Sequence, residues 1–428
     1  MNESFNSVNR RTFLKSSFLV TLFSLPFTKV FAANSAISVK QLGNPSDSQI
    51  NLLITASTSA RVYVEYGYSK AAYTGKTPIV NLTKAGTANI SITGLKASSK
   101  VYYRVRYATG TLKTFLALPQ TSLTTAKAGI TEVFAVQADP HMDENSSADV
   151  YNGTLKQIVA AAPSFLMDLG DIFMVDKLSD KSEKNIRGRF ELMKGFYEKL
   201  GAVPLMITLG NHDGELGYST FNTKKYRKEY FPEQTGDFAY YAFSGPDSLH
   251  ISLDPFTYTT KTPTIDGWEW TLGKVQYDWF KSTLEASKAK HKFIYIHHLL
   301  VGDPQSRGGV EIAMLNEWGG NNRDGTYGFD TKRPGWGKPI HQLLQENNVG
   351  FVFKGHDHLY VKQELDGIIY QTLPQPSHPG NKINVNQYGY ISGKGVGGSG
   401  FLKVSAGPSN VKVEFVSFNG EILDSYER

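Results

Sequence analysis

Short apolar runs, each followed at once by polar side chains, recur through the second half of the chain. Residues 204–209, Pro-Leu-Met-Ile-Thr-Leu, end in the Gly-Asn-His-Asp-Gly of residues 210–214. A short apolar run closed by glycine is typical of a buried strand, and open α/β sheets place their sites at the carboxyl ends of strands. The arrangement is repeated at four more places, residues 134–138, 165–169, 293–296 and 349–354. The pattern predicts buried strands whose ends share one site.

Helical patterns lie between these strands. They cover residues 149–161, 183–200, 274–289 and 339–347, the last two with apolar residues at three- and four-residue spacing. Alternation of strands and helices predicts α/β layering, with helices packed on sheets.

The end of the chain returns to β character. We expect residues 401–404, 411–418 and 420–423 to extend a sheet of this part. Residues 395–400 are rich in glycine, and because no helix follows them they indicate a loop rather than a phosphate cradle.

The first part of the chain has a different pattern of residues, with short strand-forming runs and no helical segments between them. Strand formers cluster at residues 50–54, 61–66, 88–92 and 101–105, with turn signals between them. This spacing predicts a β-sandwich over residues 36–125. Residues 94–105 resemble the corner and late strand of a fibronectin type III domain, although Val101 stands where that family usually has tyrosine. Residues 121–128 are interpreted as a linker to a second domain at residues 130–428.

The amino terminus has the features of an export signal. Arg10 and Arg11 precede Thr-Phe-Leu-Lys, an apolar stretch follows at residues 18–27, and small residues surround Ala32. The apolar part is too short to span a bilayer, so the alternative is a short amphipathic helix or anchor. The run resembles a twin-arginine signal, which directs folded proteins to the twin-arginine export machinery. We expect residues 1–32 to be removed and the bacterial protein to be periplasmic or secreted, with no stable membrane span.

Composition narrows the possible partners and sources of stability. The net charge is +6, but residues 1–32 carry +3 of it, so the remainder is too weakly basic to predict nucleic-acid binding. The 428 residues include no cysteine. An exported protein of this kind has no disulfides, and its stability must come from core packing and from metal.

Six of the ten histidines occur in the polar clusters that follow predicted strands. A single histidine would be interpreted as a core or surface residue, but six beside carboxylates and an amide favour a shared site. The cluster residues are Asp139, His141, Asp171, Asn211, His212, His297, His298, His356 and His358. Carboxylate, imidazole and amide ligands without thiolate suit divalent ions such as Mn, Fe or Zn.

The order of these motifs is similar to that of the calcineurin-like metallophosphoesterase superfamily. Asp-x-His, Gly-Asp, Gly-Asn-His-Asp, a strand-ending His and Gly-His-x-His follow one another from about residue 130 to the carboxyl end. The resemblance implies a four-layer sandwich of two mixed sheets flanked by helices, with two metal ions. It implies that Asp139, His141, Asp171 and His358 hold one ion, and that Asp171, Asn211, His297 and His356 hold the other. It further implies that a metal-bridged hydroxide attacks the phosphate ester, with bridging Asp171 and general acid His212 as catalytic residues.

Three features of the site stay open at this level. Either His297 or His298 could reach the metal, and the family pattern favours His297. Asp143 and Asp213 are interpreted either as carboxylates that orient histidines or as ordinary turn and capping residues. The glycine-rich insertion at residues 302–338 either shapes substrate access or is an ordinary loop. Its aromatic and cationic residues are Trp318, Tyr327, Phe329, Trp336, Arg307, Arg323, Lys332 and Arg333.

Differences between this sequence and known branches of the superfamily indicate which subclass of phosphoesterase it resembles. Purple acid phosphatases also pair a β-sandwich with the metal domain, but Met174 occupies the place of their iron-binding tyrosine. We therefore expect an exported, purple-acid-phosphatase-like enzyme that hydrolyses a small phosphorylated substrate with ordinary divalent ions. One alternative is a phosphodiesterase that acts on cyclic nucleotides or glycerophosphodiesters. Another is a non-catalytic envelope binding protein whose sandwich attaches to a partner. A carbohydrate-binding role for the sandwich would require an exposed aromatic row such as Tyr63, Tyr66 and Tyr68.

Overall fold

The structure is a computed structural model that describes residues 36–42, 45–83, 86–214, 224–231, 239–256, 267–301, 307–380 and 385–428. The expected export signal at residues 1–32 and the start of the insertion at residues 302–306 lie outside these ranges. Residues 36–428 form one compact unit, and the domain boundary near residues 125–130 stays a prediction. None of the helices in the described ranges combines the length and apolar character needed to cross a membrane.

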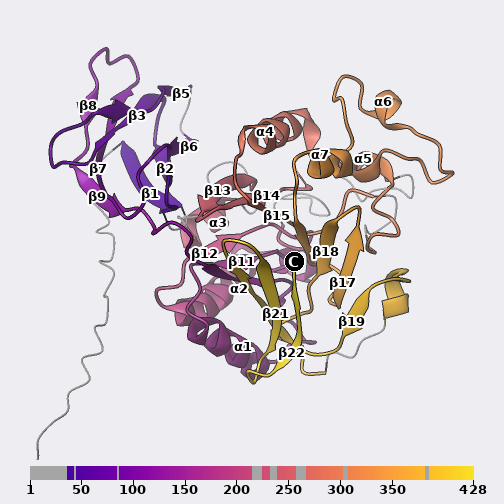
Figure 1. Cartoon of the computed structure of the whole chain (residues 1–428). Helices are drawn as coiled ribbons and strands as arrows, with labels where there is room; N and C mark the ends of the chain where they lie inside the picture. Colours follow the sequence, from indigo (N-terminus) through magenta and orange to yellow (C-terminus); the bar gives the residue numbers. More distant parts are fainter. Residues whose placement is uncertain are drawn as a thin grey trace, which may run out of the picture. The chain divides into compact units, whose positions relative to one another are not determined.

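Two antiparallel sheets form the first part (Figure 1). One has the order β1-β2-β6, with β1 (Ile37–Leu42), β2 (Ile50–Ala56) and β6 (Gly86–Ile92). The other has the order β4-β3-β7-β8, with β5 beside β3 and β9 beside β7. Its strands are β3 (Ala60–Gly67), β4 (Gly75–Lys76), β5 (Val80–Leu82), β7 (Lys100–Thr109), β8 (Leu116–Ala117) and β9 (Thr121–Thr124).

Alternate side chains of both sheets meet in one hydrophobic cluster, as half-buried strands require. All four predicted strands of this part are present. The linker interpretation is wrong for residues 121–124, because β9 pairs with β7. The finer assignment to fibronectin type III stays a prediction.

Two mixed sheets form the second part. The first has the order β12-β11-β10-β20-β21-β22 and comprises β10 (Glu132–Gln137), β11 (Leu166–Asp168), β12 (Leu205–Ile207), β20 (Gly400–Ala406), β21 (Val411–Ser417) and β22 (Ile422–Glu427). The second has the order β13-β14-β15-β16-β18-β17-β19 and comprises β13 (Tyr241–Gly245), β14 (Ser248–Ser252), β15 (His291–Ile296), β16 (Phe351–Lys354), β17 (Tyr360–Leu365), β18 (Ile368–Thr372) and β19 (Lys394–Val396).

Helices cover the outer faces of these sheets (Figure 1). The helical segments of this part are α1 (Ala148–Ala160), η1 (Val175–Lys177), α2 (Glu183–Tyr197), η2 (Glu198–Leu200), α3 (Lys224–Tyr230), α4 (Gly273–Ala286), α5 (Asn316–Gly319), α6 (Phe329–Lys332), α7 (Ile340–Glu346) and η3 (Val385–Tyr388). Phe134 of β10 and Phe293 of β15 pack between the sheets, with ring centroids 5.0 Å apart. Their neighbours Ala135 and Ile294 face the helical layers, because successive side chains of a strand point to opposite faces.

The expected α/β sandwich is therefore present, and the sheet topology brings the predicted site together. Strands β10, β11 and β12 are parallel to one another, as are β14, β15, β16 and β18. The carboxyl ends of parallel strands lie at one edge of a sheet. Five polar clusters thus follow β10, β11, β12, β15 and β16 at such edges.

Three local predictions need correction. Residues 395–400 are not one loop, because β19 includes Gly395 and β20 begins at Gly400. The last strand begins at Ile422 rather than residue 420, since Gly420 has φ +91° and lies in a turn. The predicted helix at residues 274–289 ends at Ala286.

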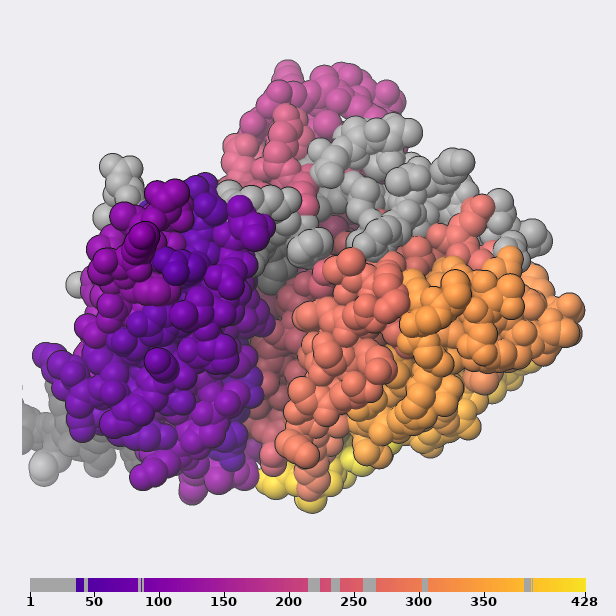
Figure 2. All heavy atoms as spheres, turned by 90° about the horizontal axis from the view of Figure 1, so that it is seen from above, coloured from indigo at the N-terminus to yellow at the C-terminus, as the bar shows by residue number. Residues whose placement is uncertain are grey.

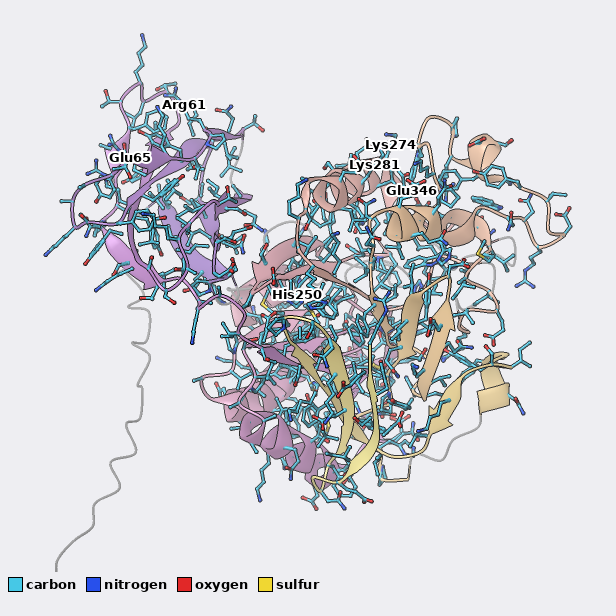
Figure 3. All side chains as sticks on the ribbon, in the orientation of Figure 1. Arg61, Glu65, His250, Lys274, Lys281 and Glu346 are labelled. Carbon is cyan, nitrogen blue, oxygen red and sulfur yellow. The ribbon has the colours of Figure 1, made fainter. Side chains whose placement is uncertain are left out.

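His250 lies inside the second part, between the sheets rather than at the predicted site (Figure 3). Its ring stacks between Phe243 and Phe293, with centroids 4.8 and 5.2 Å away. Nε2 lies 3.1 Å from Oε2 of Glu132, and Nδ1 lies 2.9 Å from the Tyr295 hydroxyl. This buried histidine has its polar atoms satisfied and is a structural residue.

Candidate metal centre

The structure brings six of the seven predicted ligands into two compact donor groups. Asp139, His141 and His358 form the first group, and Asp171, His297 and His356 form the second; within each, the candidate ligand atoms all lie within 4.8 Å of one another. His297 Nε2 lies 3.3 Å from Asp171 Oδ2 and 3.9 Å from Asp139 Oδ1, so the two groups adjoin.

The seventh predicted ligand, Asn211, lies beside the second group. Its Oδ1 atom is 3.0 Å from Nε2 of His297. Asp171 is shared in position, because its Oδ2 atom is also 3.8 Å from Nε2 of His141. The predicted bridging place of Asp171 agrees with this geometry, while the ligand roles themselves stay predictions.

Backbone conformation aims these side chains at one point. Five of the predicted ligands have positive φ, between 51° and 71°, namely Asp139, His141, Asp171, His356 and His358. Left-handed backbone is uncommon for residues with a Cβ and costs of order 1–3 kcal/mol each, so it persists only where surrounding structure imposes it. Its concentration at these loops indicates a functional site.

Glycine permits the loops to approach one another. A Cβ at Gly210 would lie 2.2 Å from both the amide nitrogen and Oδ1 of Asp171. A Cβ at Gly355 would lie 2.7 Å from Oδ2 of Asp139. The glycines that precede Asn211 and His356 in the sequence motifs are therefore required for close packing of the loops.

The donor set suits divalent metal ions. Among the described residues, Oδ1 of Asp139 and Nε2 of His141 are buried and have no hydrogen-bond partner. Buried polar atoms are nearly always paired, so unpaired acceptors that face one another indicate a missing cation. Oxygen and imidazole donors without sulfur match the preference of Mn, Fe and Zn.

Electrostatics at the first group also favour a cation. Burial alone would raise the pKa of Asp139, but His358 and His141 beside it hold that pKa well below its usual range. Burial alone would lower the pKa of His141, but the carboxylates of Asp139 and Asp143 beside it raise it to about 10. The carboxylates thus attract positive charge, which a proton or a metal ion can supply.

His297 and His298 have different surroundings. Nδ1–H of His297 donates to the Leu169 carbonyl over 2.8 Å, which leaves Nε2 directed at Asp171. This backbone contact fixes the tautomer, as it does for most metal-binding histidines. His298 instead packs edge-on against Trp270, with centroids 4.4 Å apart, and burial lowers its pKa to about 3. The geometry favours His297 as the ligand.

His212 adjoins the second group without belonging to it. Its Nε2 atom is 4.0 Å from Oδ2 of Asp171, and its Nδ1 atom is 2.8 Å from Oδ2 of Asp176. Asp176 was not predicted from the sequence. It lies in η1, five residues after Asp171, and no spacing rule marks it, because its role depends on two loops that meet in space.

Two further residues brace the ligand loops. Asp213 accepts hydrogen bonds of 2.7 to 3.0 Å from the backbone N–H groups of Asp171, Ile172, Phe173 and Gly210. It therefore caps loop amides rather than orienting a histidine. Arg189 of α2, which sequence reasoning missed, donates to the carbonyl oxygens of His141, Met142 and Phe173.

Asp143 does contact a histidine, with Oδ2 3.2 Å from Nδ1 of His141.

The insertion combines structural residues with one that contacts the site. Trp318 is fully buried and donates to the Tyr370 hydroxyl, so it cannot stack on a ligand. Arg333 pairs with buried Glu317. Arg307 donates to the carbonyl oxygen of His356 over 2.6 Å. Figure 2 shows the insertion, in orange, beside the surface that includes α4.

The tyrosines of the first part do not form one aromatic row. Tyr63 lies on the outer face of β3, where its ring packs edge-on against Phe115 with centroids 5.0 Å apart. Tyr66 packs against the hydrophobic cluster on the other face. Figure 3 shows Arg61 and Glu65, which belong to β3 as Tyr63 does. Tyr63 and Tyr66 thus lie on opposite faces of β3, so they do not form the exposed row that a carbohydrate-binding role would require.

Comparisons with known proteins give a family match over the second part. Residues 133–360 match the family described as Calcineurin-like phosphoesterase. No curated protein matches the chain. Among solved structures, that of PhoD is similar over 91% of this chain and 88% of its own, with 12% identity and a TM-score of 0.48. GAP50, described as the anchor in the inner membrane complex of Plasmodium, is similar over 69% of this chain and 88% of its own, with 14% identity and a TM-score of 0.47. At these TM-scores the two likenesses carry no conclusion about function.

Proposed function

The chain belongs to the calcineurin-like phosphoesterase family, and on this premise we propose that it hydrolyses phosphate monoesters with two divalent metal ions. The observation that carries the proposal is the pair of adjoining donor groups. Metal dependence follows from the family. The number of ions, their bridging arrangement and the preference for monoesters are the finer part of the proposal.

Each donor group would hold one ion. Asp139, His141 and His358 would hold the first, and His297, His356 and Asn211 the second, with Asp171 between them. Bound there, Mn, Fe or Zn would polarise the phosphoryl group and lower the pKa of a water molecule. Asp213 and Arg189 would keep the loops in the geometry that the ions need.

His212 would supply the proton that the leaving oxygen requires. Asp176 contacts Nδ1 with both carboxylate oxygens, so the ring is held with Nε2 toward Asp171. A ring that donates Nδ1–H to Asp176 can transfer a proton from Nε2 when it is doubly protonated. General acids placed in this way contribute typically 10²- to 10⁴-fold to the rate.

We also propose that the enzyme acts outside the cytoplasm on a small phosphorylated substrate. The support is the sequence pattern of residues 1–32, which resembles a twin-arginine signal. Fusion of residues 1–35 to a reporter tests this, in cells with and without a functional twin-arginine system. Export of the reporter only in the competent cells, and its loss in Arg10→Lys/Arg11→Lys, are the expected results.

The test of the catalytic proposal is hydrolysis of a matched aryl phosphate monoester and diester. Metal-stripped, Mn-loaded and Zn-loaded protein would be compared with Asp171→Asn and His212→Ala. We expect metal-dependent turnover of the monoester that Asp171→Asn abolishes. Preference for the diester would establish the phosphodiesterase alternative. If loaded protein turns over neither ester and equals the variants, the binding-protein alternative replaces the proposal.

A further inference from the structure

Asp357 is the single residue between two predicted ligands that belong to different donor groups. His356 lies in the group with Asp171, and His358 lies in the group with Asp139. In no other case do two predicted ligands from different groups lie so close together in the sequence. The separation of the two groups therefore depends directly on the conformation of residues 356–358.

This turn is not in a relaxed backbone conformation. His356 has φ +71° and His358 has φ +58°. The turn is closed by a backbone hydrogen bond of 2.9 Å from the Asp357 N–H to the Gly355 carbonyl. Strained backbone of this kind needs outside contacts to hold it.

The side chain of Asp357 supplies such contacts. It is 1% exposed, and its Oδ2 atom accepts from three donors in three separate segments. Lys354 at the end of β16 donates through Nζ over 2.8 Å, and the Gly308 N–H of the insertion donates over 3.0 Å. The hydroxyl of Tyr390, from the loop after η3, donates to the same atom. One buried carboxylate thus joins three segments beneath the turn.

Further buried groups surround this carboxylate. Lys354 and Tyr390 are both buried, and the Tyr390 hydroxyl also lies 3.0 Å from Oγ1 of Thr372. The Arg307 guanidinium is 3.5 Å from Oδ1 of Asp357 and donates to the His356 carbonyl. Within the described part of the chain, Oδ1 of Asp357 has no hydrogen-bond partner, so the carboxylate is held by the three hydrogen bonds to Oδ2 and by the Arg307 ion pair. Loss of one of these partners would leave a buried charge less well compensated.

We propose that Asp357 is a positioning residue that sets the distance between the two metal ions, an inference that rests on the two-ion centre of the proposed function. Asp357 is not a member of either donor group. It acts through the backbone of His356 and His358, which it holds in the left-handed conformation.

The test is Mn(II) binding to metal-stripped protein, together with electron paramagnetic resonance of the Mn-loaded form. Two Mn(II) ions about 4 Å apart would give an exchange-coupled signal, which depends on their distance. The variants are Asp357→Asn and the milder, isosteric Tyr390→Phe. The control is Glu317→Gln, which alters an equally buried carboxylate of the insertion that pairs with Arg333 and does not contact the ligand turn.

We expect Asp357→Asn to weaken binding of at least one Mn(II) by 10- to 100-fold, the usual effect of altering a partner of metal ligands, and to replace the coupled signal with that of isolated ions. Tyr390→Phe should shift both readouts in the same direction by less, and Glu317→Gln should leave both unchanged. Wild-type affinity and an unchanged coupled signal in Asp357→Asn would overturn the inference. If that variant does not fold, an unchanged Tyr390→Phe overturns it.

The outcome is separable from that of the proposed function. If the wild type hydrolyses the ester and the variants keep the coupled signal, only the inference is contradicted. If the wild type shows the coupled signal but hydrolyses no ester, the catalytic proposal is contradicted and the inference is not. Binding of fewer than two ions by the wild type contradicts both.

Discussion

Nδ1 of His212 lies 2.9 and 2.8 Å from the two carboxylate oxygens of Asp176. The loops that contain His212 and Asp176 are also joined through the backbone, because the Val175 N–H donates to the His212 carbonyl over 2.8 Å. The backbone N–H of His212 in turn donates to Oδ1 of Asp171. His212 is thus held through Nδ1 of its ring by Asp176 and through its backbone N–H by Asp171, although it belongs to neither donor group.

Asp176→Asn should lower kcat about 10- to 100-fold with little change in KM, because the ring loses its orientation while the phosphate site is retained. The loss should be larger for a phenyl ester than for a 2,4-dinitrophenyl ester, since a good leaving group needs no proton. Steady-state kinetics on the two esters measure it, with Asp180→Asn, an exposed carboxylate of the same segment, as the control. Equal losses on both esters would contradict the role of this pair in proton transfer.

Gly210→Ala should damage the centre far more than a typical glycine substitution. The new Cβ would meet the Asp171 amide nitrogen and Oδ1 at 2.2 Å, so the loop must shift. We expect the free energy of unfolding to fall by about 1–3 kcal/mol and Mn(II) affinity to fall with it. In the control Gly188→Ala, nothing lies within 4 Å of the new Cβ on helix α2, and stability should rise by about 0.5–1 kcal/mol. Similar effects of the two substitutions would count against the close loop packing.

Stability should depend on pH through Asp168. Burial raises the pKa of this carboxyl to about 7, although Gln137 and Tyr197 donate to it. The folded state therefore keeps a proton that the unfolded chain releases near pH 4, so the free energy of unfolding falls as pH rises from about 4 to 7. The contribution is at most about 4 kcal/mol.

Urea unfolding of metal-free protein at several pH values measures this effect. Asp168→Asn should become more stable relative to wild type as pH rises, and exposed Asp278→Asn should not. Parallel curves for Asp168→Asn and wild type across this range would show that Asp168 does not hold a proton.

Much of the fold was predictable because its signals are local. The apolar runs and the glycines after them mark β10, β11, β12, β15 and β16 directly, and the ligand motifs lie within a few residues of those strand ends. Five motifs in order sufficed to place the seven predicted ligands and His212 together.

The strands that were missed carry weaker or overlooked signals. Asp366 and Gly367 join β17 to β18 with φ of 50° and 75°, and Asp-Gly between two strands is a strong hairpin signal. A two-residue Pro-Asp connection likewise joins β13 to β14, with Asp247 at φ +56°. Both turns could have been recognised from the sequence.

The supporting residues of the site were not predictable in the same way. Arg189 stands on α2 beside buried Phe190, and its targets are backbone carbonyls of two distant loops. Asp357 and Asp176 likewise act on partners far along the chain. Such roles depend on which loops meet, and no periodicity or spacing in one sequence records that.

Removal of metal should lower stability as well as activity. Asp139 and Asp171 are buried carboxylates whose oxygens lie 3.9 and 3.3 Å from the same atom, Nε2 of His297, and a cation offsets their repulsion. At a Mn(II) concentration of 100 times Kd, binding should stabilise the protein by about 2.7 kcal/mol. Thermal unfolding with chelator and then with Mn(II) checks this, and Asp171→Asn serves as the control. A wild-type Tm that does not respond to Mn(II), or a variant that responds equally, would contradict it.

The most direct measurement is the rate of aryl phosphate hydrolysis as Mn(II) is added stepwise to metal-stripped protein. The account predicts no turnover without metal, a rise that reaches its plateau at two Mn(II) per chain, and no rise in Asp171→Asn. Turnover that persists in the stripped protein, or none with two Mn(II) bound, would contradict a metal-dependent phosphoesterase built on these two donor groups.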